Sequence, residues 1–537
     1  MKTPYKVYPS IQDFLELFKT TEPLFLDAET VGFYGKVRLI QAYQPHLDHV
    51  VIVEWPNVYE LATVLDKFHN VYHNAHYDVT TVQQQMGTRW VPDKVDDTFL
   101  LARLVFKDKL EFSLDMAFTY VLGYCPYTKQ NLDKKALQKS DWSKQILTLE
   151  QYLYAATDVF YMPQLWERVK VALEDQNYIL DMLTLGYCFD FQWNGMATTE
   201  DGLNERYREN ERAVADLAVP VNVNSWQQVR PYIGEERSDD LALAGFQMNG
   251  NVRAANVRKA RKLIKQNSFI SKFQTQDGRI YGKFKPSARS GRLTSNDQNL
   301  QQLPRKLKGC FEAPTGRVLV YADYAQVELR TICAIVVCTA MEKLFRAGVD
   351  LHGYTAEMVF GTDWTKDDRQ LSKTYNFLLL YGGGVNMLLG NLLKQDVFIT
   401  ERQAIRDRRK WRLLWKEIYG WQEAGIAKWT KGRLGSTPMG REYKAKMMTD
   451  YLSIENQGAG AEVAKLALHY FYPKMKQYNV DHGTDFMLVN FIHDSFITEG
   501  PDEPEHYKAI AVMKAECMQT AWFEISKLFR IKDLPMP

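Results

Sequence analysis

The feature that most constrains the fold is a change of pattern near residue 175. Before it, short apolar runs such as PLFLDAET, VRLIQAY, HVVIVEW and VYHNAHYDV alternate with helical patterns. This alternation is typical of an α/β domain with a central sheet. From about 176 to 290 the sequence is helical and basic, with the loop-like PVNVNS near its middle. Since 537 residues are too many for one core, we expect three regions, 1–175, 176–290 and 291–537.

Two strand signals stand out in the third region. RVLVYAD (317–323) runs straight into the helical pattern AQVELRTICAIV. FMLVNFIHDSFITEG (486–500) has two apolar stretches that flank the polar residues His493, Asp494 and Ser495, a pattern that predicts a β-hairpin. The sequence between the two signals is mainly helical, so this region is expected to mix helices with a small sheet.

Charge is distributed unevenly along the chain. The net charge is only +2, but residues 251–310 contain 15 Lys or Arg against two Asp, which gives this block +13 and leaves −11 for the rest. Such a block is either a disordered basic arm or a phosphate-binding surface. Apolar residues are interleaved with the charges, so we favour an ordered contact region for nucleic acid.

Membrane and disulfide classes are disfavoured. No apolar run reaches the roughly 18 residues of a membrane span, and MKTPYKVYPS lacks the apolar segment of a secretory signal, so we expect a cytoplasmic protein with no membrane partner. The cysteines form no C-x-x-C pair, which predicts reduced, buried thiols and no zinc site. They are Cys125, Cys188, Cys310, Cys333, Cys338 and Cys517.

Acidic residues mark three places in the first region. Asp27 and Glu29 are two apart at the end of a strand-like run, so both point to one face of a strand. Asp78 ends HNAHYD, and Asp158 follows Tyr154 by four residues on an expected helix. Each alone is more often a surface residue or a helix cap. Together they can hold two divalent cations for the displacement of a phosphodiester.

In order and spacing these blocks resemble the DEDD-type 3′→5′ exonucleases. The matching blocks are DAET (27–30), the N-x-x-Y-D of Asn74, Tyr77 and Asp78, and the Y-x-x-x-D of Tyr154 and Asp158. The resemblance implies a ribonuclease H-like mixed sheet with helices and a proofreading domain over 1–175. It also implies that Asp27, Glu29, Asp78 and Asp158 bind metal and that Tyr154 orients the attacking water. Asp96 and Asp97 lie outside this set and are expected to be structural, for example as a helix cap.

A second pattern is the stretch RQLSKTYNFLLLYG (369–382). Arg369, Lys373, Phe377 and Tyr381 recur in steps of four, which on a helix drift by about 40° per step and form one stripe about 18 Å long. Its cationic first half and aromatic second half suit a ligand with one anionic and one flat end, such as a nucleoside triphosphate. The alternative is an amphipathic core helix with two snorkelling cations.

Two carboxylates flank the stripe in sequence. Asp323 ends the first strand signal, and Asp494 occupies the turn of the expected hairpin. Either alone is more often a turn residue on the surface. At adjacent strand ends they can bind a metal pair for nucleotidyl transfer.

The stripe and its flanking motifs are similar to those of family A DNA polymerases. The fingers-helix motif R-x-x-x-K-x-x-x-F-x-x-x-Y-G ends here at Gly382, and DYAQVELR (323–330) resembles the first palm motif. SGRLTSNDQNLQQLP (290–304) and IHDS (492–495) resemble two further blocks of the family. The resemblance implies an α+β right-hand polymerase domain. Residues 176–290 would form the thumb and the start of the palm, and 291–537 the palm and fingers.

The resemblance also assigns roles residue by residue. Asp323 and Asp494 would bind metal, assisted by the carbonyl of Tyr324. Arg369 and Lys373 would bind the triphosphate, and Glu328 would exclude ribonucleotides by closing the space beside the sugar 2′ position. The other expected dNTP contacts are Gln326, His352 near the triphosphate, Phe377 on the sugar and base, and Tyr381 by the template base. The expected primer and template contacts are Arg292, Asn299, Gln301, Gln302, Gln457 and His493, and the basic block would follow the duplex phosphates.

The implied cofactor is Mg²⁺, two ions per active site, which Mn²⁺ can replace. The implied partners are primer-template DNA and dNTPs, with a processivity factor or a helicase-primase as a further candidate. Because the chain starts almost directly with the exonuclease blocks, without a separate 5′ nuclease domain, it resembles phage or organellar replicases. The location would then be the host cytoplasm for a phage protein, and an organellar matrix remains open.

Four positions depart from the family pattern. Ser495 replaces the usual acidic residue after Asp494, Phe491 a glutamine, Ala325 a serine and Gln302 an asparagine. Both expected metal ligands are intact, so the departures bear on primer-terminus contacts and metal affinity and leave the expected reaction unchanged.

Our leading hypothesis is a template-directed DNA polymerase with a proofreading exonuclease that serves DNA replication. One alternative is an exonuclease whose C-terminal half only binds nucleic acid, but it has no need of Asp323, Asp494 and the stripe together. The other is a relative of the single-subunit RNA polymerases, which resemble this chain in the Arg, Lys and Tyr of the stripe. Phe377, Glu328 and the exonuclease blocks favour DNA.

Overall fold

A computed structural model describes residues 2–537, apart from the side chains at positions 200, 296 and 305. The chain forms two compact units. Unit 1 comprises the residues up to Trp193 together with Lys285–Ser287 and Met439–Lys444, and unit 2 comprises Asn194–Phe284, Ala288–Pro438 and Ala445–Pro537. The expected boundaries at 175 and 290 stay predictions.

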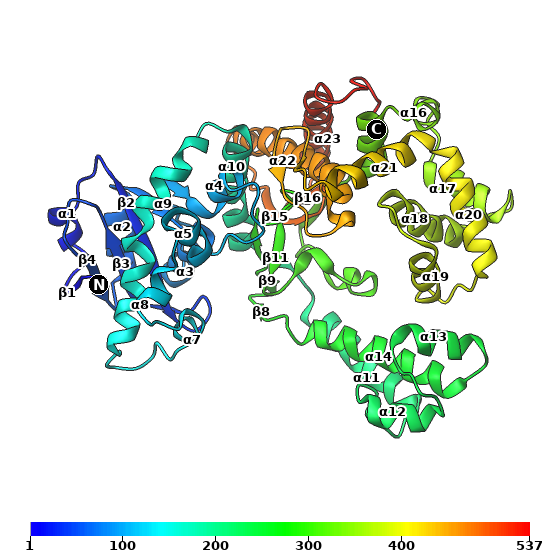
Figure 1. Cartoon of the computed structure of the whole chain (residues 1–537), viewed down its shortest axis with the longest axis horizontal. Coiled ribbons are helices and arrows are strands. Elements are labelled where there is room, and N and C mark those ends of the chain that lie inside the picture. Colours follow the sequence, from blue (N-terminus) through cyan, green and yellow to red (C-terminus); the bar gives the residue numbers. More distant parts are fainter. Residues whose placement is uncertain (1) are drawn as a thin grey trace. The chain divides into compact units, whose positions relative to one another are not determined.

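Unit 1 is built on a mixed six-stranded sheet with the strand order β1-β4-β3-β2-β5-β6. Figure 1 draws this unit in blue and cyan. The β2–β3 and β3–β4 pairs are antiparallel, whereas β1–β4, β2–β5 and β5–β6 are parallel. The strands are β1 (Tyr5–Tyr8), β2 (Pro23–Val31), β3 (Lys36–Tyr43), β4 (Val50–Glu54), β5 (His69–Tyr72) and β6 (Lys94–Asp97). The expected α/β domain with a mixed sheet is confirmed.

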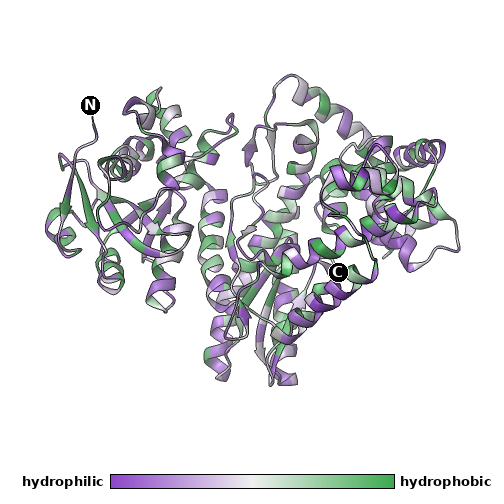
Figure 2. Ribbon diagram, turned by 90° about the horizontal axis from the view of Figure 1, so that it is seen from below, coloured by the Kyte–Doolittle hydropathy of each residue, from purple (hydrophilic) through white to green (hydrophobic). Residues whose placement is uncertain are grey.

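Helices cover the sheet of unit 1, and the apolar side chains of its central strands are buried. Figure 2 colours these strands largely as hydrophobic. Helix α8 contacts both β2 and β3. The helices are α1 (Asp13–Leu17), α2 (Val58–Leu65), α3 (Ala75–Met86), α4 (Thr98–Val105), α5 (Leu114–Leu122), α6 (Pro126–Lys129), α7 (Lys134–Gln138), α8 (Leu149–Phe160), α9 (Met162–Val169), the 3-10 turn η1 (Lys170–Ala172) and α10 (Gln176–Asn194).

Two details of unit 1 correct the sequence analysis. VYHNAHYDV is not one apolar strand, because β5 ends at Tyr72 and α3 begins at Ala75. The chain turns at Asn74, whose φ of 77° is left-handed and ends extended structure. Asp27 and Glu29 do not end their strand, because β2 continues to Val31. Short strands β1 and β6 were not predicted.

Unit 2 begins with a helical group that has its own small core. Helices α11 (Glu200–Asp216), α12 (Trp226–Ile233), α13 (Asp240–Met248) and α14 (Val252–Ile270) are drawn in green in Figure 1. Val229, Leu243, Val257 and Ala260 are buried there. One short strand, β7 (Met196–Ala197), precedes α11. The elements after α14 are also short: β8 (Thr275–Gln276), β9 (Arg279–Ile280), β10 (Lys283–Lys285), β11 (Thr294–Asn296), η2 (Leu300–Gln302) and η3 (Arg305–Cys310).

The second sheet of interest has three antiparallel strands in the order β12-β16-β15. They are β12 (Arg317–Ala322), β15 (Met487–Ile492) and β16 (Ser495–Pro501), so the predicted strand and hairpin are both confirmed. The long helices α22 (Met448–His482) and α23 (Pro504–Ser526) pack together, and α23 also contacts β12 and β16.

Helices between β12 and α22 complete unit 2. They are α15 (Val327–Val336), α16 (Thr339–Arg346), α17 (Leu351–Phe360), α18 (Lys366–Leu380), α19 (Val385–Leu393), α20 (Glu401–Leu414) and α21 (Lys416–Thr430), followed by β13 (Gly435–Ser436). The next strand, β14 (Glu442–Tyr443), belongs to the Met439–Lys444 segment of unit 1. All six cysteines are free thiols, as predicted, and all but Cys125 are buried. No helix in residues 2–537 is long and apolar enough to cross a membrane.

Candidate active sites

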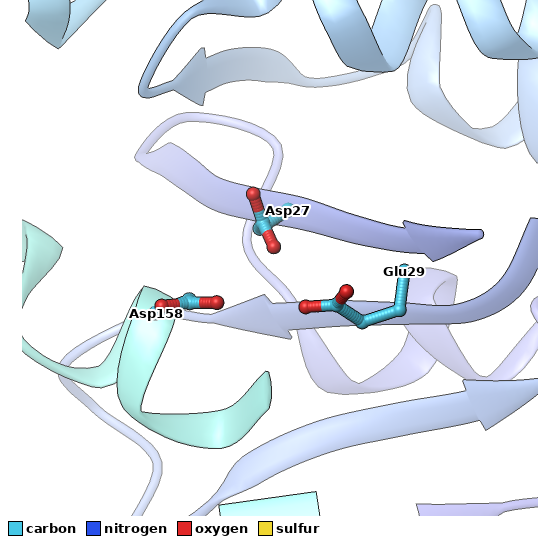
Figure 3. Close-up of side chains that lie close together, drawn as sticks. All are labelled: Asp27, Glu29 and Asp158. Carbon is cyan, nitrogen blue, oxygen red and sulfur yellow. The ribbon is translucent and has the colours of Figure 1, made fainter. Parts of the chain in front are cut away.

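Three of the four acidic residues predicted in unit 1 converge. Asp27 and Glu29 lie on one face of β2, and Asp158 lies near the end of α8. One carboxylate oxygen from each lies within 4.8 Å of the others, and Figure 3 shows the three side chains pointing toward one another. Glu29 and Asp158 are buried and Asp27 is partly buried. Such a set of oxygen donors fits a divalent cation.

Asp78 lies in the first turn of α3, beside these three residues. Its Oδ1 accepts a hydrogen bond from the backbone N of Ala28, at 3.0 Å, which links it to β2 between Asp27 and Glu29. All four carboxylates line one cavity of about 600 Å³. The cavity is also lined by Phe33, Asn74, Tyr77, Phe99, Lys134, Lys139, Trp142, Tyr154 and Lys285.

The carboxylates of this cavity repel one another. Burial, and then the charges of Asp78, Asp158 and Glu29, raise the pKa of Asp27 well above its usual range. Burial also raises the pKa of Glu29 and Asp78, and it raises that of Asp158 to about 6. Bound cations would remove this penalty, because they favour the charged form of each carboxylate.

Neutral donors that the sequence analysis missed hold two of these carboxylates. The buried Tyr127 donates its hydroxyl hydrogen to Oδ1 of Asp158. Gln41 Nε2 donates to Oδ2 of Asp27 at 2.7 Å. Lys134 lies 5.2 Å above the Tyr127 ring. Tyr127 lies 31 residues before Asp158 and outside every motif, so no spacing signal could have found it.

Asp96 and Asp97 are structural, as expected. Asp97 caps α4 by accepting from the backbone N of Phe99. Its oxygens also accept from the backbone N of Asn74 and of Ala75, at 2.9 and 3.1 Å, and so hold the turn that leads to Asp78. Asp96 accepts from Tyr178.

Unit 2 contains a second cavity, of about 830 Å³. Asp323 directly follows β12, and Asp494 lies in the turn between β15 and β16, so the pairing of these strands brings the two carboxylates into one cavity. Every residue predicted to bind metal or dNTP in this region lines it. These residues are Asp323, Tyr324, Gln326, Glu328, His352, Arg369, Lys373, Phe377, Tyr381 and Asp494.

The carboxylate pair of unit 2 is also electrostatically unfavourable without a cation. Burial, and then the charge of Asp323, raise the pKa of Asp494 to about 7. Burial raises the pKa of Asp323 as well. The turn that holds Asp494 places His493 at a left-handed φ of 57°. Ser495, which departs from the family pattern, donates to the carbonyl of Ile492 at 3.1 Å and closes that turn.

The predicted stripe lies on α18. Arg369, Lys373 and Phe377 are helical, and Tyr381 is the residue at which the helix ends, because Gly382 follows with a left-handed φ of 81°. Arg369 is already engaged by Asp350, with Nε–Oδ2 at 2.5 Å and Nη2–Oδ1 at 3.0 Å. Among the described residues no ion pair engages Lys373.

Glu328 joins three parts of this cavity. It pairs with Arg292, with Nη2–Oε1 at 2.5 Å, and accepts a hydrogen bond from the hydroxyl of Tyr381. Asn456 Nδ2 donates to the same hydroxyl at 3.1 Å. Glu328, in the block 323–330, therefore joins Arg292 of the block 290–304 to Tyr381 at the end of α18. The sequence analysis predicted Arg292, Glu328 and Tyr381 as separate site residues. It did not predict Asn456 or Asp350.

The predicted DNA contacts divide into two groups. Arg292, Gln457 and His493 line the cavity of unit 2. Asn299, Gln301 and Gln302 do not line this cavity. Asn299 Oδ1 accepts hydrogen bonds from the backbone N of Gln301 and of Gln302. Gln301 Nε2 donates a hydrogen bond to the carbonyl of Phe491 at 3.1 Å. Gln302 is exposed. Their contact with DNA stays a prediction.

The basic block is partly structural. Arg258 is only 2% exposed and pairs with Asp240 and Asp396. Arg279 pairs with Glu499 at 2.7 Å. The expectation that the whole block follows phosphates is therefore too broad, because these arginines neutralise acidic residues inside unit 2.

Two family models match this chain. Residues 194–529 match the model of DNA polymerase family A, and residues 9–174 match a model of a 3′-5′ exonuclease. DNA polymerase I of Aquifex aeolicus is 26% identical over 93% of this chain and 92% of that protein. The thermostable DNA polymerase I of Thermus thermophilus is 26% identical over 59% of this chain but only 41% of its own length.

A solved structure shows the same fold. The POL domain of Pol1 from M. smegmatis, in complex with DNA primer-template and dNTP, aligns with a TM-score of 0.73 at 17% identity. The alignment covers 96% of this chain and 94% of that one. The predicted exonuclease domain followed by a polymerase domain is confirmed. The chain belongs to DNA polymerase family A and is a DNA polymerase that carries a 3′-5′ exonuclease domain.

Proposed function

We propose that the cavity of unit 2 extends a DNA primer and that the cavity of unit 1 removes mismatched 3′ ends. The observation that carries the first assignment is that Asp323, Asp494 and the stripe of α18 meet in one cavity. The convergence of Asp27, Glu29 and Asp158 carries the second. Both sets consist of hard oxygen donors, which fits Mg²⁺, with Mn²⁺ as a substitute.

In the polymerase site Asp323 and Asp494, with the carbonyl of Tyr324, would hold two Mg²⁺ ions. Bound metals of this kind activate the attacking 3′-OH and stabilise the attacking and leaving oxygens of an in-line displacement. Lys373 and Arg369 bind the triphosphate, and Arg369 shares its guanidinium with Asp350, which keeps the fork in place. The primer 3′-OH attacks the α-phosphate and pyrophosphate leaves.

The aromatic end of α18 orients the nucleotide. Phe377 is 36% exposed and faces His352, at 5.7 Å between ring centroids, so a flat apolar surface is open to the sugar and base. Tyr381 stands by the template base. Glu328, held by Arg292 and Tyr381, closes the space beside the sugar 2′ position, which excludes ribonucleotides.

In the exonuclease site Asp27, Glu29, Asp78 and Asp158 would hold two Mg²⁺ ions. Tyr154 orients the water that attacks the terminal phosphodiester. Tyr127 fixes the orientation of Asp158 through its hydrogen bond to Oδ1.

The substrates are primer-template DNA and dNTPs. The M. smegmatis structure, solved with both, supports this part of the proposal through the shared fold. A phage or organellar type and a processivity factor or helicase-primase partner stay predictions from the sequence.

The proposal is tested by primer extension. Purified protein with Mg²⁺ and all four dNTPs is given a primed template, and a mismatched primer is supplied in parallel without dNTPs. We expect the matched primer to lengthen and the mismatched primer to shorten. A protein that shortens primers and never lengthens one would contradict the polymerase assignment.

A further inference from the structure

A buried lysine lies behind the polymerase sheet, outside the cavity. Lys514, near the middle of α23, is 0% exposed. Its Nζ donates to the carbonyl of Val320 at 2.7 Å, to the carbonyl of Phe496 at 3.1 Å and to Oγ1 of Thr498 at 3.1 Å. The three acceptors match the three donors of an ammonium group. In the described part of the chain no carboxylate pairs with Lys514.

The acceptors bracket the two catalytic carboxylates. Val320 lies on β12, three residues before Asp323, and Phe496 lies on β16, two residues after Asp494. In the sheet, Val320 pairs with Thr498 and Ala322 pairs with Phe496. One ammonium group therefore ties together the two strands that place Asp323 and Asp494.

The same helix holds the chain on the other side of Asp323. The hydroxyl of Tyr324 donates to the carbonyl of Met518, one turn further along α23, at 2.7 Å. Asp323 thus lies between two attachments to α23, one through Val320 and one through Tyr324. Asp494 is fixed to the same helix through Phe496.

Fold stability alone does not explain a lysine at this position. Burial of an ammonium group without a carboxylate partner is costly, and an apolar side chain of similar length would pack without that cost. The rings of Phe471 and Phe496 lie 5.4 and 5.0 Å from Nζ and offer it cation–π contacts. Burial nevertheless lowers the pKa of Lys514 well below its usual value, so the charged form is unfavourable here. A local cost that persists beside an active site indicates a functional constraint.

We propose that Lys514 is a positioning residue of the polymerase site and that its three hydrogen bonds fix the separation of Asp323 and Asp494. The inference rests on the proposed role of these two carboxylates as metal ligands. It predicts that loss of the ammonium group weakens metal binding in unit 2 while the fold and the exonuclease site are preserved.

The test replaces Lys514 by methionine in the full chain, with Lys508→Met, an exposed lysine of the same helix, as the matched control. The first measurement is thermal unfolding by circular dichroism. The second is Mn²⁺ titration followed by electron paramagnetic resonance in an Asp27→Ala, Asp158→Ala background, which reports on the polymerase carboxylates. The third is single-turnover primer extension over a range of Mg²⁺ concentrations.

We expect Lys514→Met to unfold at or above the temperature of the unsubstituted protein and to bind Mn²⁺ about tenfold more weakly. Extension should fall at low Mg²⁺ and recover at high Mg²⁺, and excision should be unchanged. Lys508→Met should leave all these values unaltered. Normal Mn²⁺ affinity in a folded Lys514→Met protein would overturn the inference, and so would a joint loss of thermal stability, extension and excision.

A second variant and a second readout test the inference if the first experiment fails. If Lys514→Met fails to fold, Thr498→Val removes one acceptor and should weaken Mn²⁺ binding in the same direction, by about threefold. Unchanged affinity in that variant would overturn the inference. If the unsubstituted protein does not extend primers, the proposed function fails, and the Mn²⁺ titration still decides the role of Lys514.

Discussion

The two carboxylate sites of this molecule are held in different ways. In the exonuclease site the acidic residues lie inside regular elements, on β2, α3 and α8, and neutral donors such as Gln41 and Tyr127 orient them. In the polymerase site Asp323 and Asp494 lie just beyond strand ends, and the partners that face them stand on a separate helix, α18. The carboxylates of the first site thus lie within one sheet and the helices that cover it, whereas the second site combines residues from strand ends and from a separate helix.

This difference fits the two reactions. An exonuclease needs a fixed set of ligands for a short terminal segment of DNA, and embedded carboxylates provide it. A polymerase must admit a new triphosphate in every cycle, so cations on a separate helix can bind and release it while the carboxylates stay in place. The predictions below test whether the sites are as separate as this comparison requires.

The largest expected effect is a double dissociation. Asp27→Ala should lower excision of a mismatched primer by at least about 10³-fold, because a metal ligand is lost, and leave extension intact. Asp323→Ala should abolish extension and leave excision intact. Both activities are measured side by side on the same labelled primer. Loss of both activities in either variant would break the comparison.

The next effect concerns the sugar. Glu328→Ala should reduce discrimination against rNTPs roughly 100-fold, because the space beside the 2′ position opens. The ratio of kcat/KM for a dNTP to that for the matching rNTP measures it, and Glu342→Ala on α16 is the control. An unchanged ratio would remove Glu328 from this role.

The two sites differ in how many of their residues could be predicted from the sequence. The α18 stripe, the β15–β16 hairpin and the Asp27-x-Glu29 pair were predictable, because each depends on periodicity within a few residues. The convergence of Asp323 and Asp494 was predictable only through the resemblance, because about 170 residues separate them. In unit 1 the apolar run VYHNAHYDV divides between β5 and α3, because Asp97, which is distant in sequence, accepts a hydrogen bond from the backbone N of Asn74 and holds the turn there.

The supporting residues were not predictable. Tyr127, Asp350 and Lys514 each act through a contact between segments far apart in the sequence, and none stands in a motif. From the sequence alone, a lysine in an amphipathic helix is predicted to lie on the surface, because composition does not show which face of the helix packs against the rest of the protein. Local patterns thus identify the residues that we propose to contact the substrate, and tertiary structure is needed to find the residues that position them.

A third prediction concerns the cations of α18. Arg369→Ala and Lys373→Ala should each raise the KM for dNTP by about 10- to 100-fold, the cost of a lost hydrogen bond to a charged group. Lys366→Ala, an exposed lysine of the same helix, should leave KM unchanged. Steady-state extension at several dNTP concentrations gives these values. If only Lys373→Ala has an effect, Arg369 serves Asp350 and not the triphosphate.

A fourth prediction concerns Tyr127, the neutral hydrogen-bond donor to Asp158 in the exonuclease site. Tyr127→Phe should lower excision by about tenfold at limiting Mg²⁺, because Asp158 loses the donor that orients it. High Mg²⁺ should restore much of the rate, and extension should not change. Tyr59→Phe, at an exposed tyrosine of α2, is the control. An equal loss at all Mg²⁺ concentrations would point to a defect other than metal binding.

The smallest effect links pH to metal binding at both sites. Burial raises the pKa of Asp158 to about 6 and that of Asp494 to about 7, so the metal-free folded protein binds protons that the unfolded chain has released. The metal-free protein should therefore lose stability as the pH rises through these values. Mg²⁺ replaces the protons, so its stabilising effect should be larger at pH 8 than at pH 5.5, by on the order of 2–4 °C in Tm.

Asp27→Asn with Asp158→Asn should remove more of this difference than Asp323→Asn with Asp494→Asn, because more carboxylates repel one another in the exonuclease site. An equal reduction by both pairs would mean that the embedded site gains no more from metal than the assembled one.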